Sequence, residues 1–342
     1  MLKNKAILIC ILLFLPVIHI GQTVKRDSLY VANWNMENLY DILDDELKND
    51  EEFLPGSDRR WNEARYEDKL NNLVKVINYI NNGCGPDILA MEEVENINVV
   101  KGLIYKLRDR DYIVAHRNSS DKRGIDVALI YDRGVLSIES LDALHVDLPN
   151  GNPTRDILHV ALVYKKNKER MHIYVNHWPS RTGGEQKSNA SRVAAAIVLK
   201  NNLDSLAIKS PGENIIILGD FNDEPGNESV EKALGARDFN CSGKQKNVLL
   251  NLAYKKYNNK EGSYLFGSKF NMLDQIIISR ALLDGKKMEY DCNSFSVIKP
   301  EFMIFREGRR KGGPIPTYEG KNYIGGFSDH FPVGAKFFLK GR

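Results

Sequence analysis

The chain has 342 residues, of which 42% are hydrophobic and 27% are charged, an ordinary composition for a globular protein. The formal net charge of +3 is close to neutral, which excludes a strongly basic, general nucleic-acid binder; any attraction for a polyanion must come from a local patch. A chain of this length can bury a large core without needing disulfide bonds or structural metal ions for stability.

The first element is an apolar segment at the N-terminus. Lys3 and Lys5 precede an apolar run from Ala6 to Ile20, and this order is typical of a secretory signal peptide. The run is shorter than the about 20 residues that a membrane-spanning helix needs. We therefore expect a signal peptide at residues 1–21 and an exported protein that is periplasmic, on the cell surface or secreted, without stable membrane insertion after removal of the leader. An uncleaved membrane anchor is the alternative.

Beyond the leader, expected strands and helices alternate along the chain. Runs of β-branched and apolar residues indicate strands, and apolar residues three and four positions apart indicate helices. We expect strands at 30–34, 87–91, 125–131, 158–164, 171–176, 214–218, 272–279 and 332–339, and helices at 62–80, 98–108 and 185–207. In the last helix, the expected buried face comprises Ala190, Val193, Ala194, Ile197 and Val198. This order predicts one α/β domain over residues 28–341, with two packed sheets and helices outside.

Polar side chains recur where the expected strands end or begin. They are Asn35, Glu93, His177, Asp220 and Asn222 after strands, and Asp329 and His330 before the last strand. Strand ends meet at the edge of a sheet, so these groups can converge on one site. The carboxylate and amide oxygens suit Mg²⁺, Mn²⁺ or Ca²⁺ rather than zinc or copper. A metal that neutralises phosphate charge, beside an acid and a base, is what phosphoester hydrolysis needs.

Six short motifs carry a family resemblance. In chain order they are Trp34-Asn35-Met36-Glu37-Asn38, Met91-Glu92-Glu93-Val94, Asn176-His177-Trp178, Gly219-Asp220-Phe221-Asn222, Leu273-Asp274-Gln275 and Ser328-Asp329-His330. Together they resemble the ordered motifs of the endonuclease/exonuclease/phosphatase superfamily, which includes deoxyribonuclease I, exodeoxyribonuclease III, the neutral sphingomyelinases and the inositol polyphosphate 5-phosphatases. The resemblance runs from about Tyr30 to Leu339, nearly the whole mature chain.

The resemblance implies a fold and a metal site. The fold is a four-layer α/β/β/α sandwich of two mixed sheets, like that of deoxyribonuclease I, with the site at one end of the sheets. Asn35, Glu93 and Asp329 would hold a divalent ion, Mg²⁺ or alternatively Mn²⁺ or Ca²⁺. Glu92 stands where many members have glutamine. We take Glu93 as the principal ligand, because Val94 then continues the usual pattern, and Glu92 is the alternative.

The resemblance also implies catalytic roles. Asp220 would orient or deprotonate the attacking water, and Asn222 would contact the scissile phosphate. His330 would contact the phosphate or act as a base, with Asp274 paired to its imidazole. His177 would protonate the leaving oxygen, as the second histidine of the deoxyribonuclease I branch does.

We add one pairing to this set. A catalytic histidine needs a carboxylate to fix its tautomer and raise its basicity. Asp126 begins the expected strand 125–131, where the deoxyribonuclease I branch carries such a partner. We therefore expect an Asp126–His177 pair beside the Asp274–His330 pair, with a surface carboxylate as the alternative for Asp126.

Arginine side chains could supply the local attraction for phosphate. Arg123 lies just before the strand that Asp126 begins, Arg181 lies shortly after His177, and Arg309 and Arg310 lie in a glycine-rich loop before Asp329. Arginine suits bidentate phosphate contacts. A solvated loop is the alternative for this last pair.

Cysteine use is sparse. Cys84, Cys241 and Cys292 remain once the leader, with Cys10, is removed. An exported protein can form a disulfide, and a Cys241–Cys292 bond and buried free thiols are both open.

These observations favour an exported, divalent-metal-dependent phosphodiesterase, most specifically a nuclease that hydrolyses nucleic acid by in-line attack of water. A metal-dependent phosphatase and a sphingomyelinase-like lipid phosphodiesterase are alternatives within the enzyme class. The alternative outside that class is a non-catalytic binding module on the same fold. We expect a monomer, and the sequence implies no protein partner.

Overall fold

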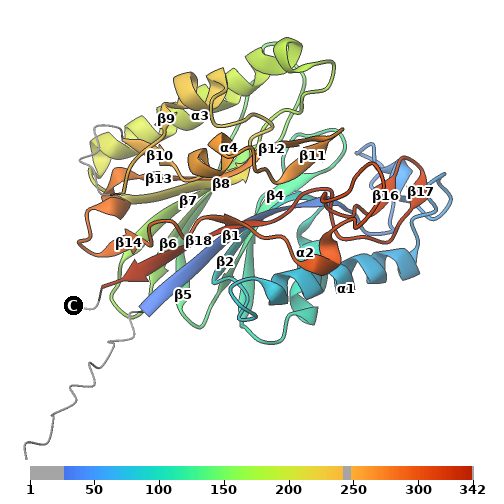
Figure 1. Ribbon diagram of the computed structural model, residues 1–342, viewed down its shortest axis with the longest axis horizontal. Helices are drawn as coiled ribbons and strands as arrows, with labels where there is room; N and C mark the ends of the chain where they lie inside the picture. Colours follow the sequence, from blue (N-terminus) through green and yellow to red (C-terminus); the bar gives the residue numbers. More distant parts are fainter. Residues whose placement is uncertain (1–26, 242–247, 341–342) are drawn as a thin grey trace, which may run out of the picture.

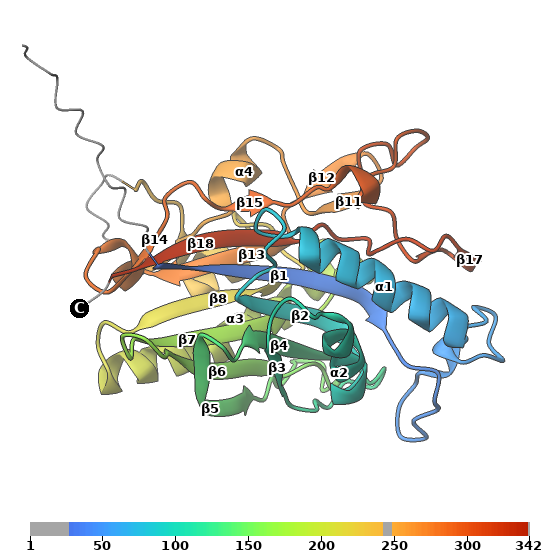
Figure 2. The same cartoon turned by 90° about the horizontal axis from the view of Figure 1, so that it is seen from below.

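The computed structural model describes residues 27–241 and 248–340. The expected signal peptide at residues 1–21 lies outside them. Two sheets pack face to face, α1 and α2 cover the outer face of one sheet, and α3 covers the outer face of the other (Figures 1 and 2). The expected four-layer α/β/β/α sandwich of two mixed sheets is therefore confirmed.

The first sheet contains the strands on which the N-terminal half of the site is built. Its order is β14 (Met288–Tyr290), β18 (Val333–Leu339), β1 (Asp27–Leu39), β2 (Ile88–Val94), β4 (Asp126–Asp132) and β3 (Tyr112–His116), and β15 (Ser296–Val297) pairs with β18. Strands β1 and β2 are parallel, whereas β1 and β18 are antiparallel. β1 is longer than expected, because it continues through Asn35 and Glu37 to Leu39.

The second sheet carries the remaining site residues. Its order is β5 (Leu136–Leu144), β6 (Ile157–Tyr164), β7 (Arg170–His177), β8 (Asn214–Asp220), β13 (Asp274–Ser279), β10 (Leu249–Asn251) and β9 (Ala236–Arg237). Strands β7 and β8 are parallel, and β8 and β13 are antiparallel. This sheet is therefore mixed as well.

Helices and short hairpins complete the described chain. The helices are α1 (Glu63–Tyr79), α2 (Ile97–Lys106), α3 (Glu185–Lys209) and α4 (Tyr254–Asn258), and the hairpins are β11 (Tyr264–Phe266) with β12 (Lys269–Asn271) and β16 (Tyr318–Glu319) with β17 (Asn322–Tyr323). Short 3₁₀ turns lie at Glu51–Phe53, Arg280–Leu283 and Glu301–Met303, and a π turn lies at Ser229–Leu234. No helix of the described residues is both long enough and apolar enough to cross a bilayer.

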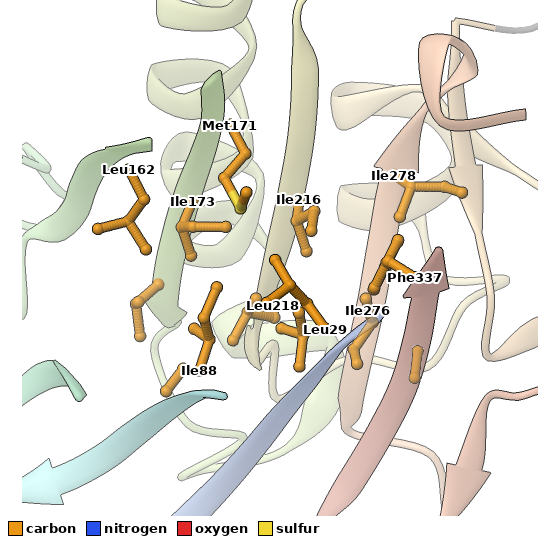
Figure 3. Close-up of a cluster of buried hydrophobic side chains, with 14 of the residues drawn as sticks. Leu29, Ile88, Leu162, Met171, Ile173, Ile216, Leu218, Ile276, Ile278 and Phe337 are labelled. Atoms are coloured by element: carbon orange, nitrogen blue, oxygen red, sulfur yellow. The ribbon is translucent and has the colours of Figure 1, made fainter. Parts of the chain in front are cut away.

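The main core lies between the two sheets. Side chains alternate between the faces of a strand, so Leu29 and Val31 of β1 point into the space between the sheets, whereas Ala32 and Trp34 point toward the helices. Figure 3 shows Leu29 and Ile88 of one sheet facing Leu218 and other apolar side chains of the second sheet. A core on both faces fixes each sheet and therefore the positions of its strand ends.

The buried face of α3 differs from the expected one. The buried residues of this helix are Arg192, Ala195, Ala196, Leu199 and Leu203. Ile197, expected on the buried face, is 47% exposed. The expectation was wrong because Arg192 lies on the buried face, where its Nε pairs with Asp223 Oδ2 at 2.8 Å, and an apolar pattern cannot report a buried arginine.

A disulfide bond joins Cys241 to Cys292, whose sequence positions are 51 apart. It ties the segment after β9 to the segment between β14 and β15. Of the two alternatives left open by the sequence, the disulfide is the one that forms, while Cys84 is free and exposed.

Replacing Cys241 and Cys292 together with Ser should lower the free energy of unfolding by about 2–4 kcal/mol, because a bond that closes a loop of this length restricts the unfolded chain. The measurement is urea denaturation of the double variant beside the wild type, without reductant. Cys84→Ser is the control and should leave the unfolding midpoint unchanged. Equal stability of the double variant and the wild type would show that the bond contributes nothing.

Candidate active site

The strand pairing explains why distant residues meet at one end of the sandwich. Asn35 lies beside Glu92 at the end of the parallel pair β1–β2, and His177 lies beside Asp220 at the end of the parallel pair β7–β8. Since β13 is antiparallel to β8, its first residue, Asp274, lies opposite Asp220. The antiparallel strand β18 likewise begins close to the end of β1 and brings the preceding residues to the same edge.

A cavity of about 660 Å³ opens at this edge. The residues expected at the site that line it are Glu93, Arg123, His177, Arg181, Asp220, Asn222, Asp329 and His330. The structure therefore brings together most of the expected catalytic, metal-binding and substrate-binding side chains. Asn35 and Asp274 lie directly behind the lining residues and contact them, as described below.

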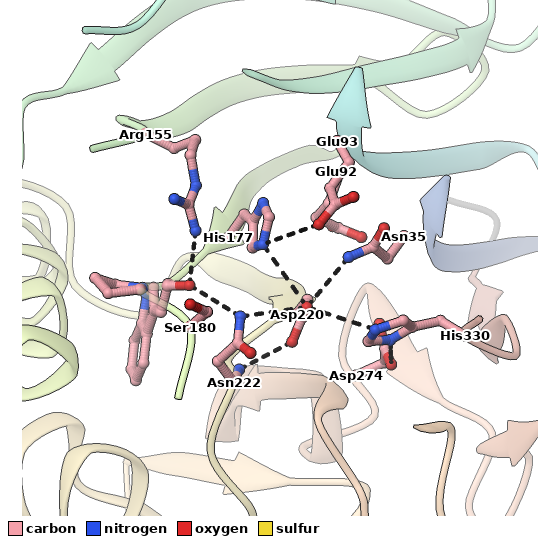
Figure 4. A network of polar contacts seen from close by, with 12 residues as sticks. Asn35, Glu92, Glu93, Arg155, His177, Ser180, Asp220, Asn222, Asp274 and His330 are labelled. Atoms are coloured by element: carbon pink, nitrogen blue, oxygen red, sulfur yellow. Dashed lines mark hydrogen bonds and ion pairs between the residues drawn. The ribbon is translucent and has the colours of Figure 1, made fainter. Parts of the chain in front are cut away.

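Asp220 lies at the centre of the polar contacts (Figure 4). Its Oδ2 accepts a hydrogen bond from Asn35 Nδ2 at 3.2 Å, and its Oδ1 accepts one from the Asn222 backbone N–H at 2.9 Å. His177 Nε2 and His330 Nε2 lie 3.8 and 3.9 Å from Asp220 Oδ2. Burial raises the pKa of Asp220 to about 6, and the neighbouring His330 opposes this shift. A carboxylate with a pKa close to neutrality is suited to accept a proton.

His330 and Asp274 form the expected pair. His330 Nδ1 lies 2.7 Å from Asp274 Oδ2, and Ser263 Oγ donates to the same oxygen. Burial alone would lower the pKa of His330, but the Asp274 carboxylate, through its charge and its hydrogen bond, and the charge of Asp220 raise this pKa well above its usual value. These neighbours therefore favour the positively charged form of His330, which is suited to stabilise a phosphate.

The expected Asp126–His177 pair does not form. Asp126 Oδ2 instead accepts a hydrogen bond from His116 Nε2 at 2.9 Å, and Asp126 Oδ1 accepts one from the Ser119 backbone. His177 Nδ1 has no hydrogen-bond partner among the described residues. The expectation was wrong because Asp126 and His116 lie on the adjacent antiparallel strands β4 and β3, whereas His177 belongs to the other sheet.

The environment of His177 is that of a neutral imidazole. Burial, followed by the positive charges of Arg155 and Arg123, holds the pKa of His177 well below its usual value. Its Nε2 lies 3.8 Å from Glu93 Oε1 and at the same distance from Asp220 Oδ2. At neutral pH this side chain can therefore donate a hydrogen bond without carrying a positive charge.

Glu93 and Asp329 are suited to hold a divalent ion. Both carboxylates line the cavity. Burial raises the pKa of Asp329 and the charge of Glu93 raises it further, while His330 opposes the shift. Two carboxylates that repel each other in a buried site are stabilised by a cation between them. The donor set therefore fits the metal that the resemblance implied.

The described residues contain no group of three or more His, Cys, Asp or Glu side chains arranged to enclose a metal ion. An ion held here would therefore have one or two protein carboxylates and complete its shell with water, which is how proteins commonly bind Mg²⁺. Both ends of the Asn35 amide are used within the protein, since its Oδ1 accepts the Glu37 N–H at 2.9 Å and its Nδ2 donates to Asp220. These contacts give Asn35 the geometry of a support for Asp220.

Glu92 and Glu93 lie in different environments. Glu92 is fully buried, its Oε2 accepts a long hydrogen bond from Asn33 Nδ2 at 3.3 Å, and burial raises its pKa well above the usual value. Glu93 lines the cavity, and its Oε2 accepts the Asn38 backbone N–H at 3.0 Å. A bulge in β2 with a left-handed backbone at Glu93, where φ is 58°, turns this second carboxylate into the cavity. The geometry therefore favours Glu93 as the exposed oxygen donor.

The four arginines expected to bind substrate fall into three settings. Arg123 lines the cavity and its side chain is 48% exposed. Arg181 also lines it, but its guanidinium already donates to Asn222 O at 2.7 Å and Asn227 Oδ1 at 3.1 Å. Arg309 and Arg310 line an adjoining cavity of about 470 Å³. Of these side chains, Arg123 is therefore the most available to a ligand in the cavity of about 660 Å³.

The sequence reasoning missed several residues near the cavity, among them Tyr264, Phe266 and Arg155. The ring of Tyr264 lies 4.7 Å from that of His330, and Tyr264 lines both cavities. Phe266, at the tip of the β11–β12 hairpin, lines the cavity of about 660 Å³ and is 72% exposed. Buried Arg155 lies beside His177 (Figure 4). It donates to Asp121 Oδ2 at 3.1 Å and to Trp178 O at 2.9 Å. Nothing in the local sequence around these residues marks them, because they reach the site through tertiary packing.

One glycine is required by a close approach of two strands. A Cβ atom at Gly219 would lie 1.9 Å from Asn176 O, and the φ of Gly219 is 149°. Gly219 therefore allows β7 and β8 to approach closely immediately before Asp220.

The sequence matches one family profile over almost its entire described length. The profile of the Endonuclease/Exonuclease/phosphatase family matches residues 30–339. A search of curated proteins finds no matching relative.

Solved structures with the same fold are distant in sequence. The human Nocturnin catalytic domain with bound sulfate is 18% identical, with a TM-score of 0.54, covering 92% of this chain and 98% of that one. TDP2 from C. elegans is 16% identical, with a TM-score of 0.53 and coverage of 91% and 75%. A mannosyl-6-phosphatase from Bacteroides thetaiotaomicron is 17% identical, with a TM-score of 0.55 and coverage of 91% and 100%. At these identities the similarity establishes the fold alone.

Proposed function

Because the chain belongs to the endonuclease/exonuclease/phosphatase family, we propose that it is an exported, divalent-metal-dependent phosphodiesterase, and most specifically a nuclease. The family supports a hydrolase that acts on phosphoester bonds. The observation that carries the finer proposal is the cavity in which Asp220 lies between two histidines, one of them paired with Asp274, and which Glu93 and Asp329 also line.

Asp220 is the base of the proposed reaction. Its pKa of about 6 leaves it ionised at neutral pH and able to accept the proton of the attacking water. Hydrogen bonds from Asn35 and the Asn222 backbone hold the carboxylate in one orientation. Such fixed geometry keeps the water in line with the phosphorus, which is the main requirement of phosphoryl transfer.

His330, Asn222 and His177 bind the substrate in this proposal. The charged imidazole of His330 stabilises the negative charge that builds up on the phosphate oxygens, and Asp274 holds the ring in place. The Asn222 amide lies at the cavity wall, with its Nδ2 donating to Trp178 O at 3.0 Å. His177 donates a hydrogen bond to the leaving oxygen from its neutral ring. Glu93 and Asp329 would hold Mg²⁺, which supplies charge neutralisation and lowers the pKa of bound water.

A metal-dependent phosphatase is the second candidate, because one structural neighbour is named a mannosyl-6-phosphatase. A sphingomyelinase-like activity on lipid is a third candidate. The apolar N-terminal run and the Cys241–Cys292 disulfide, which requires an oxidising compartment, support export to the periplasm, the cell surface or the medium. A monomer without a protein partner remains part of the proposal.

A panel of substrates tests this function. We expect metal-stripped protein, resupplied with Mg²⁺, Mn²⁺ or Ca²⁺, to hydrolyse plasmid DNA, RNA or bis-p-nitrophenyl phosphate faster than p-nitrophenyl phosphate, because the proposal assigns it a diester, and faster than sphingomyelin, because it assigns it nucleic acid and not lipid. EDTA should abolish turnover. Faster release of phosphate from the monoester would favour the phosphatase, and preference for sphingomyelin would favour the lipid enzyme. No turnover of any substrate would favour the non-catalytic binding module. Activity that survives EDTA would contradict the proposed dependence on a metal ion.

A further inference from the structure

A lysine is completely buried on the inner face of α1. Lys69 is 1% exposed and lies among apolar residues of the helix such as Leu70 and Leu73, which face the first sheet. Its Nζ donates to Thr317 Oγ1 at 2.6 Å and to Phe327 O at 2.8 Å. Lysine is almost never fully buried without a partner, so the position needs a reason beyond helix packing.

The partner of Lys69 is Glu37, on the distorted end of β1. The Nζ atom lies 3.6 Å from Glu37 Oε2, which also accepts the Thr317 backbone N–H at 2.6 Å. Replacing a buried ion pair by apolar side chains is often neutral or stabilising. Stability alone therefore does not account for this pair.

The contacts of Lys69 lead to both carboxylates that face the cavity. Glu37 is followed by Asn38, whose backbone N–H donates to Glu93 Oε2 at 3.0 Å. Phe327 precedes Ser328, whose hydroxyl donates to Asn35 O at 2.7 Å and accepts the His330 N–H at 3.0 Å. Asp329 lies between Ser328 and His330 in the chain. One ammonium group thus joins the segment that orients Glu93 to the segment that carries Asp329.

We propose that Lys69 is a positioning residue for the divalent ion. Its ammonium group, on the side of α1 that faces the first sheet, holds together the two chain segments that set the distance between Glu93 and Asp329. The proposal rests on the metal site of the proposed function. Side chains that support metal-binding carboxylates from behind commonly change metal affinity by about 10- to 100-fold when they are replaced.

The test measures metal binding directly. Lys69→Met combined with Glu37→Gln removes both charges, so neither is left buried alone. We expect the folded double variant to bind Mn²⁺ at least about tenfold more weakly than the wild type in isothermal titration calorimetry, and its activity to need correspondingly more Mg²⁺. Thermal denaturation followed by circular dichroism shows whether the variant is folded.

The matched control is Lys106→Met combined with Glu67→Gln. This pair, 2.6 Å apart, also joins α1 to another segment, but it lies at the surface. Its removal should leave the affinity for Mn²⁺ unchanged. Thr317→Val, which deletes one acceptor of Lys69 with little change in shape, serves if the first variant does not fold, and should weaken Mn²⁺ binding by about threefold or more.

The outcomes separate this proposal from the proposed function. If the folded double variant, or Thr317→Val in its place, binds Mn²⁺ as tightly as the wild type, Lys69 is only a structural residue and the inference is overturned. If the wild type itself binds neither Mn²⁺ nor Mg²⁺, the metal-dependent function fails first, and the role of Lys69 fails with it.

Discussion

Asp220→Asn should lower kcat by about a hundredfold or more, with little change in KM. The amide nearly matches the carboxylate in shape and can keep the hydrogen bond from the Asn222 backbone, but it cannot accept the proton of the attacking water. Loss of a general base typically costs 10²- to 10⁴-fold in rate. The measurement is steady-state hydrolysis of bis-p-nitrophenyl phosphate at saturating Mg²⁺.

The pH profile provides the control for this assignment. The base acts in its ionised form, so activity is lost as the pH falls through the pKa of Asp220, about 6, and is retained above it. The acidic limb of kcat/KM should therefore disappear in Asp220→Asn. A variant that retains near-wild-type kcat, or the same acidic limb, would show that another group takes the proton.

His330→Ala should also lower kcat by about a hundredfold or more, because it removes the positive charge next to the reacting phosphate. Asp274→Asn should have a smaller effect of the same kind. It leaves the imidazole in place but weakens the hydrogen bond from His330 Nδ1 that fixes the ring, and it removes the negative charge that favours the protonated imidazole. The double variant should be no slower than His330→Ala, because Asp274 acts through His330. The measurement is a double-mutant cycle of kcat on the same diester.

The control for this cycle is the other histidine–aspartate pair. His116 and Asp126 are both buried and form a hydrogen bond of 2.9 Å, as the catalytic pair does, but neither lines the catalytic cavity. His116→Gln should lower stability and leave kcat unchanged. If the effects of His330→Ala and Asp274→Asn were additive, Asp274 would have a role independent of His330. If His116→Gln lowered kcat, the His116–Asp126 pair would contribute to catalysis.

Much of the fold and the core of the site were predictable because both depend on strand ends. Residues such as Asp220 lie at the end of a buried apolar strand, and parallel neighbours bring such positions to one edge. The pairing of His330 with Asp274 was also expected, and it is confirmed. These predictions required only that each strand be identified.

Residues that act across elements were not predictable in the same way. Asp126 starts a strand, as expected, but its partner depends on which strand lies next to it, and β3 was not expected at all. Lys69 and Arg192 interrupt apolar faces of helices, so sequence patterns assign them to solvent although ion pairs bury them. Arg155 and Tyr264 have no local motif. Side-chain pairing across sheets and loops is a property of tertiary packing and leaves no periodic signal.

The close contact at Gly219 limits how this enzyme could be adapted. Even one methyl group there would collide with the main chain of Asn176, so the spacing between the ends of β7 and β8 is set by the backbone itself. We therefore expect variation that alters the choice of substrate in the surrounding loops that line the cavity, such as the β11–β12 hairpin with Phe266 and the segment that carries Arg181. Libraries directed at those loops should yield folded proteins with new preferences, whereas libraries directed at the strand ends should mostly yield inactive ones.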